Sequence, residues 1–119
     1  MPIKMNTNEK ALHERRVLVL KALAHSSRLY IVMRLAEREV SVGELTSEIG
    51  ADISTVSKHL AILRDAGLVA DRREGQTVLY SLSCACILDF LHCVDAIAPF
   101  DETGIRRGSV CQIRKPMPV

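Results

Sequence analysis

The residues of this sequence best suited to chemistry are its cysteines, which are concentrated toward the C-terminus. Three of the four lie within ten positions, at Cys84, Cys86 and Cys93, and the fourth is Cys111. Clustered thiols in a reducing compartment favour soft metal ions, metalloids or redox chemistry over structural disulfides. The alternative interpretation is that these cysteines are small apolar side chains of a packed helix. The clustering therefore predicts a thiol site, with packing as its competitor.

The spacing of Cys86 and Cys93 limits how they can share an ion. The stretch 84–97 is predicted to be a helix capped by Ser83. Seven helical residues separate the two cysteines by about 10.5 Å along the axis, at about 1.5 Å per residue. Because thiolate–metal bonds are only about 2.3 Å long, one straight helix cannot bring both to the same ion. Cys84 and Cys86 would share the first turn, where exposed N–H groups and the helix dipole favour thiolates.

A second kind of chemistry is suggested by the stretch 52–67, which reads as one amphipathic helix. Asp52 stands at an N-cap position, and Gly67 stands where a helix ends. The apolar stripe at i, i+4 and i+7 consists of Val56, Leu60 and Leu63. The opposite face carries short polar and cationic side chains, which suit the major groove of DNA: Ser54, Thr55, Ser57, Lys58 and His59. The alternative is an ordinary amphipathic surface helix.

The residues before this helix predict its partner in a helix-turn-helix motif. An S-x-x-E capping box, from Ser41 to Glu44, opens a short helix over 42–49, which Gly50 ends. So tight a connection to the next helix is typical of a helix-turn-helix. Two further helices are expected upstream, over 9–24 and 26–38, the second capped by Ser26 or Ser27. The side chains of these three helices expected to face the core are Leu12, Val19, Leu20, Leu23, Leu29, Val32, Met33, Leu35, Leu45 and Ile49.

After Gly67 the apolar pattern changes to a period of two, which predicts a β-hairpin. Its strands are expected over 68–73 and 77–82, with Gly75 supplying the turn. A hairpin directly after a DNA-reading helix is a wing. The residues near its tip expected to contact phosphates or a minor groove are Arg72, Arg73 and Gln76.

Composition bounds the class of protein. A chain of 119 residues with 48% hydrophobic and 25% charged residues is expected to form one globular domain, over 9–98, between flexible ends at 1–8 and 99–119. A net charge of only +2 requires any DNA-binding charge to be localised. No run approaches the roughly 20 apolar residues of a membrane span, and Lys21 interrupts the one stretch that imitates a signal peptide, so a cytoplasmic protein is expected. No catalytic constellation is visible, and an enzyme is not expected.

Four segments in this order resemble the arsenic-repressor/metallothionein-repressor (ArsR/SmtB) family. They are LKALAHSSRL over 20–29, STVSKHL over 54–60, AGLV over 66–69 and the wing sequence RREG over 72–75. The likeness covers about 12–97. It implies a mainly α, α+β fold of the winged helix-turn-helix type, with five helices and a hairpin between the fourth and fifth. It also implies a homodimer built from the helices over 9–24 and 84–97, and operator contacts from the fourth helix and the wing.

The sensor sites of that family differ from what this sequence offers. Where its arsenic repressors carry Cys-x-Cys, this chain reads Ser41-Val42-Gly43, and of the zinc-type site on the last helix only Asp89 and His92 are present. The cysteine spacing instead suggests a site between subunits. If the last helices of two subunits pack antiparallel, Cys86 of one lies opposite Cys93 of the other across the two-fold axis. The ligands expected there are Cys84 and Cys86 of one chain and Cys93 of the other, with Cys111 as a weaker addition.

The function expected from the sequence is therefore that of a homodimeric repressor that binds double-stranded operator DNA without an obligatory cofactor and without a membrane. It would release the operator when a thiophilic metal or metalloid binds the cysteines, with As(III) or Sb(III) first and a soft divalent ion such as Cd(II) second. The alternatives are a thiol-redox or persulfide sensor of the same fold, and a winged-helix protein-interaction module that does not bind DNA.

Overall fold

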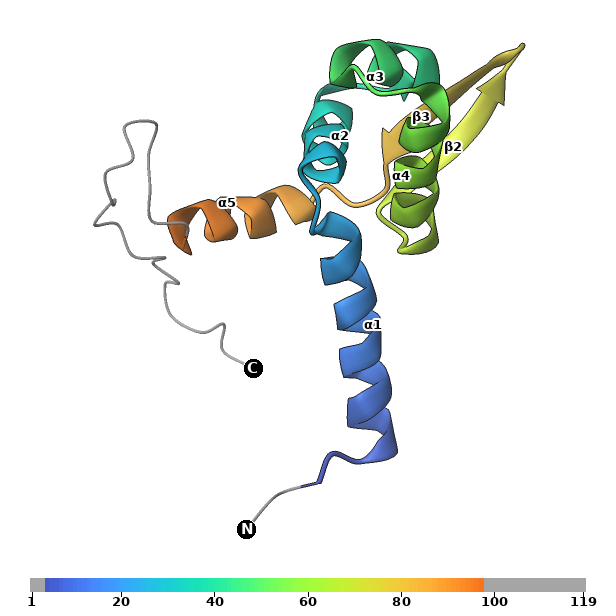
Figure 1. Cartoon of the computed structure of the whole chain (residues 1–119). Coiled ribbons are helices and arrows are strands. Elements are labelled where there is room, and N and C mark those ends of the chain that lie inside the picture. Colours follow the sequence, from blue (N-terminus) through green and yellow to red (C-terminus); the bar gives the residue numbers. More distant parts are fainter. Residues whose placement is uncertain (1–3, 98–119) are drawn as a thin grey trace. The chain divides into compact units, whose positions relative to one another are not determined.

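The computed structural model describes residues 4–97, which form five helices and three short strands. In chain order these elements are α1 (Thr7–Leu23), α2 (Ser26–Glu37), β1 (Val40–Ser41), α3 (Val42–Ile49), α4 (Ile53–Asp65), β2 (Val69–Glu74), β3 (Thr77–Leu82) and α5 (Ile87–Ile97). Two compact units divide the chain, one ending at Cys84 and the other beginning at Ala85. The helix-turn-helix and its hairpin both lie in the first unit, which confirms the predicted winged helix-turn-helix (Figure 1).

The first two helices begin at caps that the sequence pattern did not indicate. Asn6 and Glu9 form a full capping box: the Asn6 Oδ1 accepts the Glu9 N–H at 2.8 Å, and the Glu9 carboxylate accepts the Asn6 N–H at 3.1 Å. Helix α1 therefore starts at Thr7, two residues before the predicted start at Glu9. Helix α2 is capped by His25, whose Nδ1 accepts the Ser27 N–H at 3.1 Å, rather than by Ser26 or Ser27.

Helix α3 keeps its predicted bounds and its predicted cap at Ser41, while the Glu44 carboxylate bonds to Arg38, the residue that follows α2. The Ser41 Oγ accepts the Glu44 N–H at 3.1 Å, whereas Arg38 binds the Glu44 carboxylate at 2.7 Å. Arg38, and to a lesser degree the Ser41 backbone, lower the pKa of Glu44. Gly50 ends the helix with φ of +78°, a left-handed conformation that favours glycine.

The recognition-type helix α4 is capped as predicted. The Asp52 carboxylate accepts the Thr55 N–H at 2.7 Å and the Ser54 hydroxyl at 2.8 Å, and these bonds lower the pKa of Asp52. At the other end Gly67 adopts φ of +85°, and the Leu68 N–H bonds to the Leu63 carbonyl at 3.0 Å. This reversal sends the chain directly into β2.

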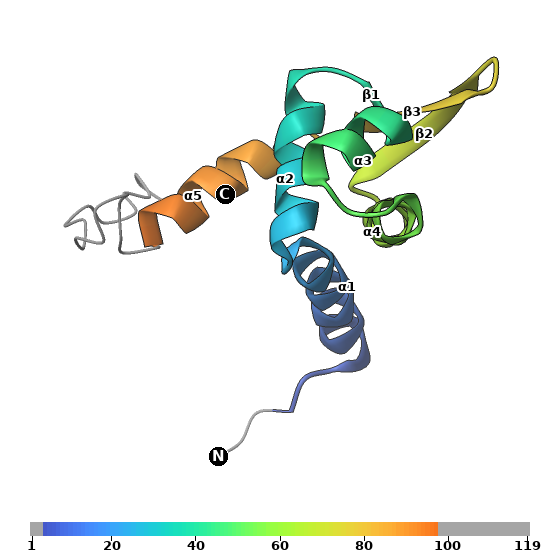
Figure 2. The ribbon, with the colours of Figure 1, turned by 45° about the horizontal axis from the view of Figure 1, so that its top comes forward.

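The three strands form an antiparallel sheet in the order β1-β3-β2. Strands β2 and β3 pair from Val69 opposite Leu82 to Glu74 opposite Thr77, so the hairpin lies one residue later on its first strand than predicted. Strand β1 pairs with β3 through Val40 and Tyr80 and was not predicted, because two residues show no periodicity. The long end of the hairpin extends beyond α3 and α4, as Figure 2 shows.

The core of the first unit lies where α2, α3 and α4 meet the sheet. The α4 stripe is confirmed, since Val56, Leu60 and Leu63 are each 0% exposed. In α2 the buried face is Ile31, Val32 and Leu35, and the predicted core residue Met33 is 45% exposed. In α1 the predicted core residues Leu12 and Leu20 are also exposed, and only the C-terminal turn is buried, at Ala22 and Leu23. Most of the apolar surface of α1 therefore remains uncovered within one chain.

The second unit contains α5, which begins three residues later than predicted. The Cys86 carbonyl accepts the N–H groups of Asp89 and Phe90, at 3.2 and 3.4 Å, so Cys86 occupies the N-cap position in place of Ser83. Pro99, Cys111 and the tail predicted over 99–119 lie outside the described residues. Between residues 4 and 97, none of the helices combines the length and apolar character that crossing a membrane requires.

Candidate nucleic-acid interface and cysteine cluster

The polar face of α4 is exposed on the helix-turn-helix. Four of the five residues predicted to read DNA are exposed: Ser54, Thr55, Ser57 and Lys58. They are held outward because Val56, Leu60 and Leu63 fix the opposite face of α4 in the core. The Ser54 hydroxyl is already engaged by Asp52. A cation and small hydroxyl groups at the start of an exposed helix can bond to phosphates and base edges.

The fifth residue, His59, lies against α2 rather than on that exposed face. Its ring is partly buried, and its Nδ1 accepts a hydrogen bond from the Arg28 guanidinium, with 3.2 Å between the nitrogen atoms. Its ring centroid lies 4.4 Å from that of His25, with the two planes 49° apart. Burial, and then the nearby His25 and Arg28, lower the pKa of His59. The sequence pattern missed this packing because His59 borders the polar face of the helical wheel.

The two wing arginines have different surroundings. The Arg72 guanidinium binds both carboxylate oxygens of Glu39 at 2.9 Å and the Glu74 carboxylate at 2.8 Å. These bonds raise the pKa of Arg72 and lower that of Glu39. Arg73 points to the other face of the strand and is exposed, as is Gln76 in the turn. Arg72 would have to leave two carboxylates to reach a phosphate, whereas Arg73 would not.

A polar cluster that the sequence analysis missed connects α2 to α3. The Glu48 carboxylate accepts hydrogen bonds from the Tyr30 hydroxyl at 2.8 Å and from Arg34 at 3.0 and 3.2 Å. Arg34 first, and Tyr30 second, lower the pKa of Glu48, while the bond to Glu48 raises that of Tyr30. The two parallel hydrogen bonds from Arg34 to the Glu48 carboxylate attach α3, the first helix of the helix-turn-helix, to α2. No short-range spacing signals these contacts, because Tyr30 and Glu48 are 18 residues apart.

The three described cysteines are all exposed. Cys93 lies within α5, whereas Cys84 and Cys86 precede its first residue, Ile87. Cys84 is the last residue of the first unit, and Cys86 is at the N-cap of α5 rather than in its first turn. Within residues 4–97 no three His, Cys, Asp or Glu side chains gather closely enough to hold a metal ion. The site predicted between subunits takes ligands from two chains and remains a prediction.

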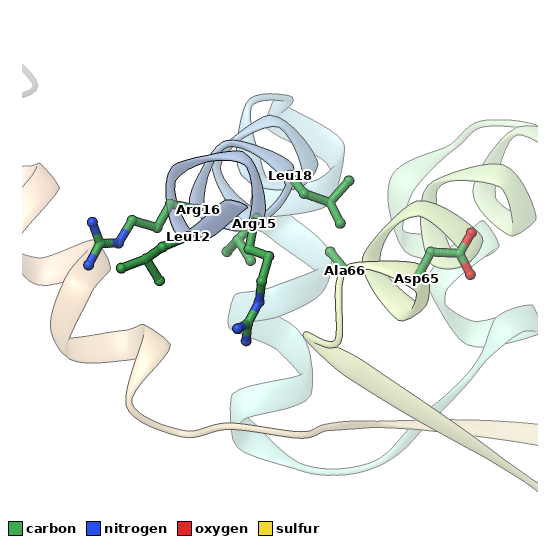
Figure 3. Close-up of a pocket in the computed structure, with 7 residues that line it drawn as sticks. Leu12, Arg15, Arg16, Leu18, Asp65 and Ala66 are labelled. Atoms are coloured by element: carbon green, nitrogen blue, oxygen red, sulfur yellow. The ribbon is translucent and has the colours of Figure 1, made fainter. Parts of the chain in front are cut away.

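A shallow hollow of about 360 Å³ lies between α1 and the end of α4 (Figure 3). Its lining residues are Leu12, Arg15, Arg16, Leu18, Val19, Asp65 and Ala66. Apolar side chains in the hollow are flanked by two arginines of the same helix. Enclosed, mostly apolar pockets are typical of small-molecule sites, and this open hollow is not one of them.

Comparison with known proteins gives matches of sequence and of structure. A family model described as bacterial regulatory protein, arsR family, matches residues 25–71. The transcriptional activator HlyU of Vibrio cholerae is 46% identical over 79 residues, which cover 64% of this chain and 73% of that protein.

Solved structures of three proteins extend this similarity. Reduced HlyU from Vibrio cholerae has a TM-score of 0.65 at 39% identity, covering 75% of this chain and 97% of that one. The homodimeric winged helix-turn-helix DNA-binding domain Mb0332 of Mycobacterium bovis has a TM-score of 0.71 at 30% identity, covering 82% and 90%. The transcriptional repressor BigR of Xylella fastidiosa has a TM-score of 0.63 at 34% identity, covering 78% and 96%.

Proposed function

The chain belongs to the ArsR family of bacterial regulatory proteins, and from this premise we propose that it is a homodimeric repressor of transcription that binds duplex DNA. The observation that carries the proposal is the exposed polar face of α4, presented beside a wing that carries Arg73. Two such helices about 34 Å apart in a dimer would enter successive major grooves.

The second copy is expected to cover apolar side chains that one chain leaves exposed. On α1 these are Leu12, Val17, Leu18 and Leu20, which are 42–54% exposed. On α5 they are Phe90, Val94 and Ile97, which are 39–71% exposed. A soluble monomer rarely exposes this much apolar surface on two helices. Mb0332 is described as homodimeric, which supports the same assembly here.

Selection of DNA from a random duplex library by the full-length protein tests this function. The expected product is a site with two-fold symmetry whose half-sites lie about one helical turn apart. Placed over a promoter, the selected site should lower transcription when the protein is added, and a rise would make the protein an activator, as HlyU is named. Failure to retain any duplex at low salt would favour the protein-interaction alternative.

The salt dependence of binding should separate the two wing arginines. Lys58→Ala and Arg73→Ala are each expected to reduce the slope of log affinity against log salt by about 0.9, because each removes one phosphate contact. Arg72→Ala is expected to leave the slope closer to that of the wild type, because its guanidinium is bound to Glu39 and Glu74.

The control for this measurement is Arg38→Ala, which removes an arginine at the C-cap of α2 that is paired with Glu44 of α3 and to which no DNA contact is assigned. Filter binding or fluorescence anisotropy across a salt series gives the slopes. A loss of about 0.9 in Arg72→Ala would mean that Arg72 leaves its carboxylates for a phosphate when DNA binds.

The inducer is proposed to act on Cys84, Cys86 and Cys93, with Cys111 as a further ligand. Three thiolates suit As(III) or Sb(III), and a soft divalent ion such as Cd(II) is the next choice. The exposure of the three described thiols supports access for either. The N-cap position favours a thiolate at Cys86.

The competing proposal is a thiol-redox or persulfide signal at the same cysteines. It is favoured by the absence of a three-ligand cluster within residues 4–97 of one chain, and by the relative HlyU, whose structure is described as reduced. A panel of metals, metalloids and thiol oxidants, scored by release of the selected duplex, distinguishes the two. Mass spectrometry would detect a disulfide or persulfide only in the redox case.

A further inference from the structure

Arg28, at the start of α2, bonds to two other helices at once. Its Nε donates to the Ala22 carbonyl at 2.6 Å, and its Nη2 donates to the Lys21 carbonyl at 3.3 Å. Both carbonyls belong to the last turn of α1. Its Nη1 donates to the Nδ1 of His59 on α4 at 3.2 Å. One planar side chain therefore fixes three helices relative to one another.

His25 strengthens this junction from the N-cap of α2. Its Nδ1 holds the Ser27 N–H, which fixes the direction of the ring. The ring then lies against His59, with the centroids 4.4 Å apart. His59 directly follows Lys58, the cation of the exposed face, and precedes Leu60, which is fully buried. The junction of His25, Arg28 and His59 thus bears on the part of α4 that the proposed function places on DNA.

We propose that Arg28 is a positioning residue for α4, which sets the presentation of Lys58 to DNA through a bond that only a neutral His59 can accept. This inference rests on the proposed function. It makes the recognition helix sensitive to the last turn of α1, the helix proposed to form the dimer. It also makes DNA affinity depend on the protonation of an imidazole that does not itself contact DNA.

The position of the proton on the His59 ring explains this dependence. A guanidinium only donates hydrogen bonds, so the His59 Nδ1 must offer a lone pair and its proton must reside on Nε2. Protonating Nδ1 would place an N–H against an N–H and a second positive charge beside the first. Among the described residues the charged or titratable groups that face His59 are Arg28 and His25, both from the start of α2, while α1 contributes carbonyls through Arg28.

The direction of the effect follows from the pKa of His59, which burial, His25 and Arg28 all lower. An unfolded histidine has a pKa of about 6.5. The stabilisation from the neutral ring is therefore complete above about pH 6.5 and is lost as the pH falls toward the lowered pKa of the folded state. DNA affinity should weaken at still lower pH, once the pH reaches the lowered pKa of the folded state, because above it the folded protein keeps a neutral His59 with and without DNA. A direct contact between His59 and a phosphate would have the opposite effect, because the imidazolium would bind more tightly as the pH falls.

The test compares the wild type with His59→Asn on the selected duplex, at fixed salt, from about pH 7.5 to about pH 4.5, which is two units below the ordinary histidine pKa of about 6.5. The asparagine Oδ1 can replace Nδ1 as the acceptor for Arg28, and it does not titrate. As the pH falls, the wild type should lose affinity relative to His59→Asn by about twofold to tenfold, since one linked proton changes affinity by at most about tenfold per pH unit. His13→Asn removes an exposed histidine of α1 and should follow the wild-type profile.

Arg28→Lys provides a second test, because lysine keeps the positive charge but lacks the planar guanidinium that bonds to α1 and α4 at once. We expect it to bind at least about fivefold more weakly than the wild type at pH 7.5, and to lose the excess pH dependence, with melting temperature checked in parallel. Equal profiles for the wild type and His59→Asn, or a wild type that gains affinity relative to it at low pH, would overturn the inference even if Arg28→Lys does not fold. Failure to select any duplex would instead overturn the proposed function.

Discussion

Replacing Cys86 with serine is expected to give a protein that binds the selected duplex as the wild type does and no longer releases it. The exposed face of α4 and the wing are in the other compact unit, so the substitution leaves the proposed DNA contacts intact. The thiol at the α5 N-cap is lost, and with it one of three proposed ligands. Typical coupling between inducer and DNA is about 5–150-fold in affinity, and this whole factor should disappear.

The measurement is duplex affinity with and without arsenite under reducing, anaerobic conditions, then with a disulfide or persulfide donor. Because linkage is reciprocal, DNA should weaken inducer binding to the wild type by the same factor. The matched control is Ser83→Ala, which alters a hydroxyl in the same connection without removing a thiol. Loss of the dimer in Cys86→Ser would favour the packing interpretation, and full release of the variant by arsenite would exclude Cys86 as a ligand.

The sequence predicted the helix-turn-helix well because local signals specify both of its helices. Helix α3 has its capping serine and a glycine that adopts positive φ, and α4 has Asp52 at its start and an unbroken apolar stripe. Each signal lies within one helix or directly beside its ends, so no knowledge of distant contacts is needed. The hairpin was predicted nearly as well, because Gly75 fixes its turn.

The features that the sequence analysis missed depend on contacts between residues that are distant in the sequence. Met33 and Ile31 are both apolar, and only the packing of α2 on α4 and the sheet determines which of them is buried. The burial of His59 depends on Arg28, which is 31 residues away, and the position of Arg72 depends on Glu39, which is 33 residues away. Propensity and spacing cannot reveal such pairs.

The cysteine cluster shows a different limit of sequence reasoning. The expected first turn at Cys84 rested on Ser83 as a cap, yet the first i→i+4 bond of α5 is accepted by Cys86. A helix start without a strong capping signal is commonly misplaced by a few residues. The correction leaves Cys86 near the exposed N–H groups and moves Cys84 away from them, so the two thiols are not equivalent.

Leu60→Ala is expected to have the largest effect on stability, because Leu60 is fully buried at the centre of the α4 stripe. Truncating a buried leucine removes apolar contacts and leaves a cavity, which costs about 2–5 kcal/mol in the free energy of unfolding. Urea unfolding at one fixed protein concentration measures this, since a dimer's stability depends on concentration.

The matched control for Leu60→Ala is Ile62→Ala, on the same helix, where the side chain is 42% exposed. It should change the free energy of unfolding by about 0.5 kcal/mol or less, as exposed sites usually do. Equal losses for both variants would contradict the assignment of the α4 faces, since the face assigned to DNA is outward only if Leu60 is inward. A large loss of unfolding free energy in Leu60→Ala alone would show that the packing of Leu60 in the core holds the polar face of α4 outward. The proposed DNA contact depends on that orientation.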